Sequence, residues 1–410
     1  MRVLAFAYAC EPGRGSEPGA GWAWARMLAQ IGETWVITRR DYATSIEHAL
    51  TSTPERENLR FVYVELPERF RGWQRDLRGL RIYYLLWQIV ALKEARRLQR
   101  TTHFDVVWHL TWATAWYGSL AALAGRPLVY GPVGGCVGTL WRLLPGLGWK
   151  GATYEVARVA THGLARYLNP LARQSWRRAD LILAQNAETR DWFPRRYRAK
   201  VRLFPNAVIR EDLLQGVDLP VRSGQSIALF AGRLEPFKGV SLCLHTLTLL
   251  PDWRLIICGA GSDESRLRHL ADRLGVGEQV VWTGWLSQDE LFSRMAEADV
   301  FLFPCLHEEA GAVIVEARAA ELPVICLDRG GPPLLIGPSG ISVADSGGAN
   351  AIARRLADAA LTCLERRRIG QGPSAERETF ALSSRAQVLQ DLLSDAFPFL
   401  TDRSATRQPP

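Results

Sequence analysis

Residues 301–317 read Phe301-Leu-Phe-Pro-Cys-Leu-His-Glu-Glu-Ala-Gly-Ala-Val-Ile-Val-Glu-Ala317. The stretch opens with an apolar run that ends at Pro304, passes through a polar loop, and enters an apolar helix near Ala310. A buried strand followed directly by a helix is the repeating unit of parallel α/β sheets, in which helices cover both faces. The segment therefore predicts a strand–loop–helix unit inside an α/β domain.

Apolar runs of the same kind recur along the whole chain, separated by amphipathic stretches of about ten to twenty residues. The predicted strands are Val3–Ala9, Trp35–Thr38, Leu59–Leu66, Asp105–Leu110, Pro127–Tyr130, Asp180–Ala184, Val201–Phe204, Ile227–Ala231, Trp253–Cys258, Val280–Thr283, Asp299–Phe303, Pro323–Cys326 and Gly340–Ala344. So many strands would be unusual in one open sheet, which predicts two parallel sheets of six or seven strands. We place a first domain at residues 1–210, a polar linker at 211–225 and a second domain at 226–375.

Composition fits a globular protein, because 48% of the 410 residues are hydrophobic and 22% are charged. The apolar run Ile82–Leu92 is too short to span a membrane, and Met1–Cys10 lacks the features of a signal peptide. We therefore expect a cytoplasmic protein, either soluble or bound to a surface. The seven cysteines form no CxxC pair, and no HxxxH or HExxH motif occurs. This pattern favours buried reduced thiols and disfavours disulfides and a protein-bound catalytic metal.

The positive charge is concentrated in the first half. Residues 1–210 hold 31 Lys and Arg against 16 Asp and Glu, whereas the remaining residues hold 19 against 26. Such a balance indicates an anionic partner, either nucleic acid or a phosphate-bearing lipid surface. A basic face that only aids solubility explains the count equally well.

The loop after the first predicted strand, Glu11–Gly21, contains four glycines and precedes a helix. Glycines let backbone amides at a helix N-terminus approach an anion, although a loose turn would look the same. The loop is not a dinucleotide fingerprint, because no third small residue is in register and Thr38-Arg39-Arg40 ends the second strand without an acid. NAD binding is therefore disfavoured.

In the second half, Arg233 and Lys238 flank a strand end and a helix start, an arrangement that suits a diphosphate. A solvated cation pair is the alternative. Glu308 stands in the loop of the opening segment, and Glu316 lies eight residues later on an apolar helix face. A buried carboxylate needs partners, and the hydroxyls of a ribose would supply them. An ion pair with Arg318, or plain exposure, is the alternative for Glu316.

With these residues in place, the chain resembles the family-4 retaining glycosyltransferases. The resemblance rests on the E-x7-E spacing of Glu308 and Glu316, and it extends over nearly the whole chain. The further matching segments are Ser16–Trp22, Asp105–His109, Gly131–Gly135, Pro205-Asn206, Gly232-Arg233, Lys238-Gly239 and Gly330–Pro332. The resemblance implies the GT-B fold, in which two Rossmann-like domains face each other across a cleft, with a C-terminal helix at 376–400 that returns to the first domain.

The resemblance also implies roles for individual residues. Arg233 and Lys238 would hold the diphosphate of a UDP- or GDP-linked sugar, Glu308 the transferred sugar, and Glu316 the ribose. The remaining implied donor contacts are Gly15, Gly19, Gly134, Gly232, Gly284, Trp285, Leu286, Ala310, Gly311 and Ala312. His109 would line the sugar site, although a packed strand-end histidine is nearly as good a reading.

Two departures from the family pattern concern the donor. Ala310 stands where an aromatic residue is common, and Glu309 adds a second acid beside Glu308, so either acid could reach the sugar. Glu321 also replaces a usual glycine. The resemblance implies front-face transfer with retention, in which the leaving phosphate helps to deprotonate the acceptor. No metal and no cofactor are expected.

The resemblance places the acceptor in the basic first domain. Arg69–Arg100 and Leu140–Arg178 mix cations with Trp73, Trp87, Trp149 and other aromatics, as surfaces that bind anionic bilayers do. We therefore expect a glycan or polyprenyl-diphosphate-linked acceptor at a membrane surface, with ordinary helical cover of a sheet as the alternative. A nucleotide-sugar epimerase or hydrolase is the rival enzyme. A nucleic-acid-binding protein is the rival of another class, although no nucleic-acid motif occurs.

Overall fold

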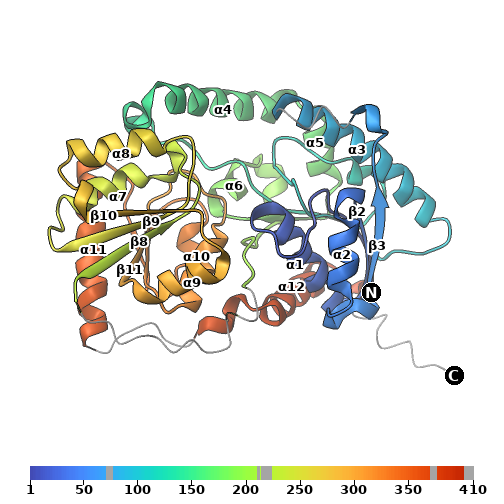
Figure 1. Ribbon diagram of the computed structural model, residues 1–410. Coiled ribbons are helices and arrows are strands. Elements are labelled where there is room, and N and C mark those ends of the chain that lie inside the picture. Colours follow the sequence, from blue (N-terminus) through green and yellow to red (C-terminus); the bar gives the residue numbers. More distant parts are fainter. Residues whose placement is uncertain (71–76, 210–212, 214–223, 370–375, 401–410) are drawn as a thin grey trace.

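Two parallel β-sheets organise the protein, as the computed structural model shows for residues 1–70, 77–209, 213, 224–369 and 376–400 (Figure 1). The first sheet has seven strands in the order β3-β2-β1-β4-β5-β6-β7, and the second has six in the order β10-β9-β8-β11-β12-β13. Every strand pair in both sheets is parallel. The predicted GT-B-type arrangement of two α/β domains is confirmed.

The strands lie where the apolar runs predicted them, with ends that differ by at most three residues. Those of the N-terminal sheet are β1 (Arg2–Phe6), β2 (Glu33–Arg39), β3 (Leu59–Val64), β4 (Val106–His109), β5 (Leu128–Val133), β6 (Leu181–Ala184) and β7 (Val201–Leu203). Those of the C-terminal sheet are β8 (Ser226–Ala231), β9 (Trp253–Cys258), β10 (Val280–Gly284), β11 (Val300–Phe303), β12 (Val324–Leu327) and β13 (Ile341–Val343).

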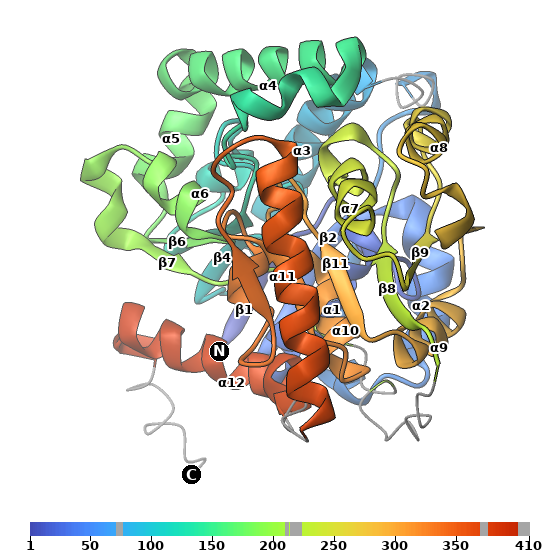
Figure 2. The ribbon, with the colours of Figure 1, turned by 90° about the vertical axis from the view of Figure 1, so that its left-hand side faces the viewer.

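Helices connect the strands and cover both faces of each sheet (Figures 1 and 2). In the N-terminal domain they are α1 (Ser16–Ile31), α2 (Ala43–Leu50), α3 (Leu77–Leu98), α4 (Gly148–Leu168), α5 (Pro170–Arg178) and α6 (Ala187–Trp192). In the C-terminal domain they are α7 (Val240–Leu247), α8 (Glu264–Arg273), α9 (Gln288–Glu297), α10 (Ala312–Ala319) and α11 (Ala349–Arg368). The central strands β1, β4, β8 and β11 are buried almost completely because both of their faces are covered.

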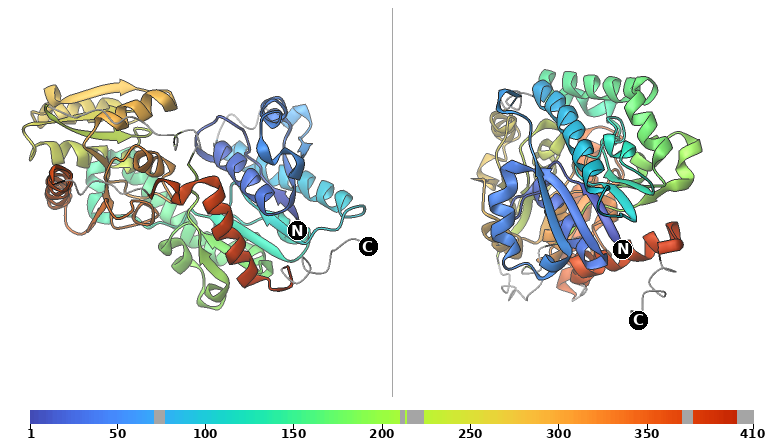
Figure 3. Two further views of the ribbon diagram at one scale, coloured as in Figure 1. Left: turned by 90° about the horizontal axis from the view of Figure 1, so that it is seen from below. Right: turned by 90° about the vertical axis from the view of Figure 1, so that its right-hand side faces the viewer.

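The last helix, α12 (Leu382–Ala396), leaves the C-terminal domain and runs along α1 of the N-terminal domain (Figure 3). Its buried side chains Leu389 and Leu393 join Trp24 and Phe204 in one hydrophobic cluster. Arg385 stacks over Phe204 at 3.8 Å and donates to the Pro205 carbonyl at 2.8 Å. The helix therefore ties the chain's C-terminal part to the first domain.

Most of the predicted linker 211–225, and the aromatic Trp73, lie outside the described residues. All seven cysteines are free and buried. Within the described part of the chain, no helix is long and apolar enough to cross a bilayer, and no group of His, Cys, Asp and Glu has the arrangement of a metal site.

Candidate functional site

A cavity of about 960 Å³ lies between the two domains. Its walls come from α3 and from the segments that follow β1, β4, β5, β6 and β7 in one domain, and from the segments that follow β8, β9, β10 and β11 in the other. This is the edge of a parallel sheet at which ligands bind, and the volume lies at the upper end of the roughly 300–1,000 Å³ that ligand sites occupy. The predicted loops of both domains therefore meet around one hollow.

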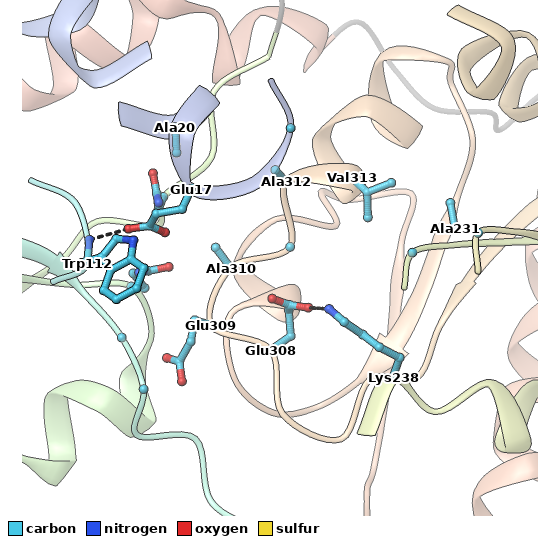
Figure 4. Close-up of a pocket in the computed structure, with 18 of the residues that line it drawn as sticks. Glu17, Ala20, Trp112, Ala231, Lys238, Glu308, Glu309, Ala310, Ala312 and Val313 are labelled. Carbon is cyan, nitrogen blue, oxygen red and sulfur yellow. Dashed lines mark hydrogen bonds and ion pairs between the residues drawn. The ribbon is translucent and has the colours of Figure 1, made fainter. Parts of the chain in front are cut away.

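Lys238 and Glu308 form an ion pair on the C-terminal wall of the cavity (Figure 4). Lys238 ends a short 3₁₀ turn after β8, and Gly239 follows it with a φ of 76°. A Cβ atom at Gly239 would lie 2.0 Å from the Pro304 carbonyl oxygen. Only glycine therefore lets the loop after β8 press against the loop after β11, which brings the ammonium to the carboxylate.

The pair is mostly buried, with 15% of the Lys238 side chain and 19% of the Glu308 side chain exposed. Burial lowers the pKa of Lys238, but the adjacent Glu308 carboxylate outweighs it, and the pKa is raised overall. Lys238 therefore keeps its positive charge inside the cavity wall.

Glu316 lies on the same wall, inside α10, and accepts a hydrogen bond from the Gln288 side chain at 3.5 Å. Most of the other residues predicted to contact a donor also line the cavity. These are Gly15, Gly134, Gly232, Trp285, Leu286, Ala310, Gly311 and Ala312. Trp285 is 64% exposed and stands at the rim.

Four predicted site residues are not part of the lining formed by the described residues: Arg233, Gly19, Gly284 and His109. Arg233 is exposed, although its charge is close enough to lower the pKa of Lys238. Gly19 packs against the Arg14 backbone of its own loop. Gly284 accepts a hydrogen bond from the Gly259 amide. A position near the end of a strand does not by itself show whether a residue faces the cavity.

His109 lies in the core of the N-terminal domain and is not among the described residues that line the cavity. It is 1% exposed, and its ring nitrogens contact the Tyr84 hydroxyl at 3.1 Å and the Ser119 hydroxyl at 2.8 Å. Burial lowers the pKa of His109 to about 3. The neutral ring therefore serves the packing of the N-terminal domain, in line with the alternative reading of this residue.

Glu308 and Glu309 face different partners. Glu309 reaches across to the N-terminal domain, where its carboxylate accepts from the Asn186 side chain at 2.8 Å and the Thr189 hydroxyl at 3.1 Å. It also accepts from the Val137 amide at 3.3 Å. Glu309 thus bridges the domains, whereas Glu308 stays with Lys238.

The N-terminal wall contains residues that were not predicted as site residues, above all Glu17, Thr114 and the aromatic side chains of Tyr84, Trp112 and Trp116. Burial raises the pKa of Glu17, and the Trp112 amide donates to its carboxylate at 2.6 Å. An acid inside the glycine-rich loop was the one available signal in the sequence.

Comparison with known sequences gives a match to the family model described as Glycosyl transferases group 1 over residues 217–372. A D-inositol 3-phosphate glycosyltransferase of Corynebacterium glutamicum is 32% identical over 186 residues, which cover 42% of this chain and 43% of the relative. A GDP-mannose-dependent alpha-(1-6)-phosphatidylinositol monomannoside mannosyltransferase of Mycolicibacterium smegmatis is 29% identical, covering 60% of this chain and 66% of the relative. The chain thus spans less than half the length of the first curated relatives that it matches.

Solved structures agree over almost the whole chain. The lipopolysaccharide outer core galactosyltransferase WaaB aligns with a TM-score of 0.59 at 14% identity, covering 96% of this chain and 99% of that one. HepE from Anabaena, solved with UDP-glucose, aligns with a TM-score of 0.56 at 17% identity, covering 96% and 100%. At these identities the likeness establishes the fold.

Proposed function

Since the chain carries a domain of the glycosyl transferases group 1 family at residues 217–372 in a GT-B-type fold, we propose that it is a glycosyltransferase. It moves a hexose from a UDP- or GDP-linked donor to a hydroxyl of a glycan or lipid-linked acceptor. The names of two relatives, one dependent on GDP-mannose and one solved with UDP-glucose, support a nucleotide-sugar donor.

The observation that carries the proposal is the Lys238–Glu308 pair inside the interdomain cavity, with Glu316 on the same wall. On donor binding, Lys238 turns from Glu308 to the diphosphate, and Arg233 adds positive potential from outside the wall. Glu308 is then free to accept hydrogen bonds from sugar hydroxyls. Glu316 accepts from the ribose hydroxyls, which replace Gln288 as its partners.

We propose retention of the anomeric configuration. The bond between the anomeric carbon and the phosphate oxygen breaks, the acceptor oxygen bonds to the same face of that carbon, and the acceptor proton passes to the leaving phosphate. Lys238 and the backbone amides at Gly311 and Ala312 stabilise the charge that builds on the diphosphate. In this scheme those groups, and not a metal ion, stabilise the negative charge on the leaving diphosphate.

A thermal-shift panel of UDP- and GDP-sugars tests donor binding, because a ligand that binds only the native state raises the melting temperature. The stabilising donor is then incubated with and without oligosaccharide and lipid-linked acceptors, and the products are separated by mass spectrometry. Sugar transfer to an added acceptor supports the proposal. Interconversion or hydrolysis that needs no acceptor supports an epimerase or hydrolase. NMR of the product's anomeric proton tests retention.

A second part of the proposal concerns where the acceptor is met. Helix α4 lies along the outer edge of the molecule (Figure 1). It exposes several apolar side chains on one face. Trp149 is 75% exposed, Leu164 61% and Tyr167 68%, and the cation Lys150 is exposed beside Trp149. Aromatic and basic side chains on one helix face suit the interface of an anionic bilayer. We therefore propose that α4 rests on the membrane that holds a lipid-linked acceptor.

Flotation with vesicles that contain an anionic lipid tests this part. The variant W149S/L164S/Y167S should lose most of its co-flotation, whereas Leu361→Ser on α11, which removes a side chain 49% exposed in the other domain, should not. Equal flotation of the triple variant and the control would discredit the membrane role of α4 and leave the donor site untouched.

A further inference from the structure

The N-terminal wall of the cavity is aromatic, in contrast to the charged C-terminal wall. Tyr84 and Trp112 pack with ring centroids 5.1 Å apart, and Trp116 and Tyr117 meet edge to face at 5.8 Å. All four residues line the cavity. Aromatic faces carry partial negative charge and attract the slightly positive C–H faces of a sugar ring.

Glu17 stands in this aromatic wall, on the first turn of α1 (Figure 4). One carboxylate oxygen accepts from the Trp112 amide at 2.6 Å, and within the described part of the chain the other oxygen has no hydrogen-bond partner. Trp112 itself has a φ of 57°, which is unusual for a bulky residue and occurs where a site over-determines the backbone. Burial also raises the pKa of Glu17. The carboxylate is thus held in place with one oxygen free to accept from a ligand.

Two more polar groups of this wall lack partners. The Thr114 hydroxyl and the Trp116 indole nitrogen are buried and make no hydrogen bond with the residues that the structure describes. Both residues line the cavity. A buried polar group without a partner is unfavourable, and a ligand with hydroxyl groups would supply the missing hydrogen bonds. The wall therefore combines apolar ring faces with one acceptor and two further hydrogen-bonding groups.

The only cation of the described residues that lines this wall is Arg81. Its guanidinium stacks over Trp116 at 5.2 Å, and the side chain is exposed. Arg81 thus lies at the outer side of the wall, and Glu17 is the acid within it. A phosphate placed against Glu17 would bring hydrogen-bond acceptors against acceptors, whereas a hydroxyl would donate to the carboxyl oxygen.

We propose that Glu17, with the aromatic wall of Tyr84, Trp112 and Trp116, binds an uncharged sugar ring as the acceptor's terminal unit. The ring lies against Trp112, because Tyr84 is only 1% exposed and His162 already stacks on Trp116 at 4.7 Å, and it donates a hydroxyl hydrogen bond to Glu17. This inference rests on the proposed glycosyltransferase function and adds to it the class of the group that receives the sugar. Glu17 is assigned as an acceptor-binding residue.

The test measures binding of methyl glucoside, galactoside, mannoside and N-acetylglucosaminide, each as both anomers, by saturation-transfer NMR in the presence of UDP or GDP. Glucose 6-phosphate and mannose 6-phosphate are the charged counterparts. At least one methyl glycoside should bind more tightly than the sugar phosphates. Glu17→Gln keeps an oxygen for the Trp112 amide but replaces the second oxygen with an NH2 group that cannot accept a hydrogen bond, so the affinity for that glycoside should fall about tenfold.

Two further variants make the result specific. Trp116→Phe keeps the ring face and loses the indole donor, so it should weaken glycoside binding by less than Glu17→Gln does. Glu11→Gln is the matched control, because Glu11 belongs to the same loop, pairs with Arg14 at 2.9 Å and is not part of the described lining. Glu17→Gln should leave the melting temperature unchanged. Its affinity for the donor should stay within about twofold of wild type, because Glu17 lies on the opposite wall from Lys238.

The outcomes separate the two proposals. If wild type binds no nucleotide sugar, the proposed function fails. If it binds the donor but no methyl glycoside, or if Glu17→Gln binds the glycoside as tightly as wild type does, the acceptor inference is overturned. Tighter binding of a sugar phosphate than of every glycoside also overturns it.

Discussion

At the scale of single residues, the surroundings of an ionisable group decide whether it is charged or neutral in this protein. Lys238 remains charged on the cavity wall because the adjacent Glu308 carboxylate raises its pKa. His109, at the end of a central strand, is kept neutral by burial between two hydroxyl-bearing side chains. A position at or beyond the C-terminal end of a strand thus gives a charged site group in one case and a core group in the other.

The buried His109 predicts how stability depends on pH. Its pKa is about 3 in the folded protein against roughly 6.5 in an unfolded chain, so folding favours the neutral ring. The stabilising contribution is present above about pH 6.5 and is lost as the pH falls toward 3. His109→Gln keeps a donor and an acceptor for Tyr84 and Ser119 but does not titrate.

Chemical denaturation at several pH values between 4 and 7 checks this. The free energy of unfolding of wild type should fall more steeply with acidification than that of His109→Gln, and the two curves should diverge by about 2 kcal/mol or more at pH 4. Parallel curves would show that His109 titrates alike in the folded and unfolded chain.

At the scale of elements, helix α12 comes from the C-terminal part of the chain but packs on the first domain. Leu389 is fully buried against the α1 cluster, whereas Val388 beside it is 48% exposed. Leu389→Ala should lower the free energy of unfolding by about 2–5 kcal/mol, because it leaves a cavity in a packed core. Val388→Ala is the control and should change it by less than about 1 kcal/mol.

Denaturant unfolding followed by tryptophan fluorescence measures both variants, since Trp24 belongs to the same cluster. Equal midpoints for Leu389→Ala and Val388→Ala would mean that α12 is not part of the cooperative N-terminal core.

Elements were also what the sequence predicted best. Strands such as Val300–Phe303 are buried on both faces, so every residue along them must be apolar. Such a run of consecutive apolar residues can be recognised in the sequence. Lys238 and Glu308, which lie in loops, and Glu316, which lies in the following helix, were predicted to share a hollow because parallel strands end at one edge, and all three line the cavity. Side-chain direction depends on tertiary contacts, which is why the sequence did not show that Arg233 and His109 stand outside the lining formed by the described residues. Glu17 was missed because its position on an aromatic wall depends on α3 and on the loop after β4.

At the scale of the whole molecule, a contact between the domains adjoins the Lys238–Glu308 pair. His307 directly precedes Glu308, and its ring stacks on Phe237, which directly precedes Lys238, at 4.1 Å. The His307 ring also contacts the buried carboxylate of Glu155 on α4 at 2.6 Å. Burial opposes ionisation of Glu155, but hydrogen bonds from His307 and Arg158 outweigh it and lower its pKa to about 2. The contact therefore carries an ionised carboxylate at neutral pH.

We predict that Glu155→Ala loosens the two domains and weakens donor binding, since His307 then loses its partner across the interface. Donor affinity should fall several-fold, in keeping with about 1–3 kcal/mol for a charged hydrogen bond. Small-angle scattering should show a larger radius of gyration without donor. Thr153→Ala, at an exposed position of the same helix, is the control. Unchanged affinity and radius in Glu155→Ala would show that the contact does not couple the domains to the site.

The central claim is that the interdomain cavity binds a nucleotide sugar through Lys238 and Glu316. Titration calorimetry of the donor that stabilises wild type tests it most directly, with Lys238→Ala, Glu316→Gln and, as an exposed control, Glu365→Gln on α11. The account predicts that wild type and the control bind alike, that Lys238→Ala loses about 10- to 100-fold in affinity, and that Glu316→Gln loses about tenfold. Wild-type affinity in both Lys238→Ala and Glu316→Gln would contradict it.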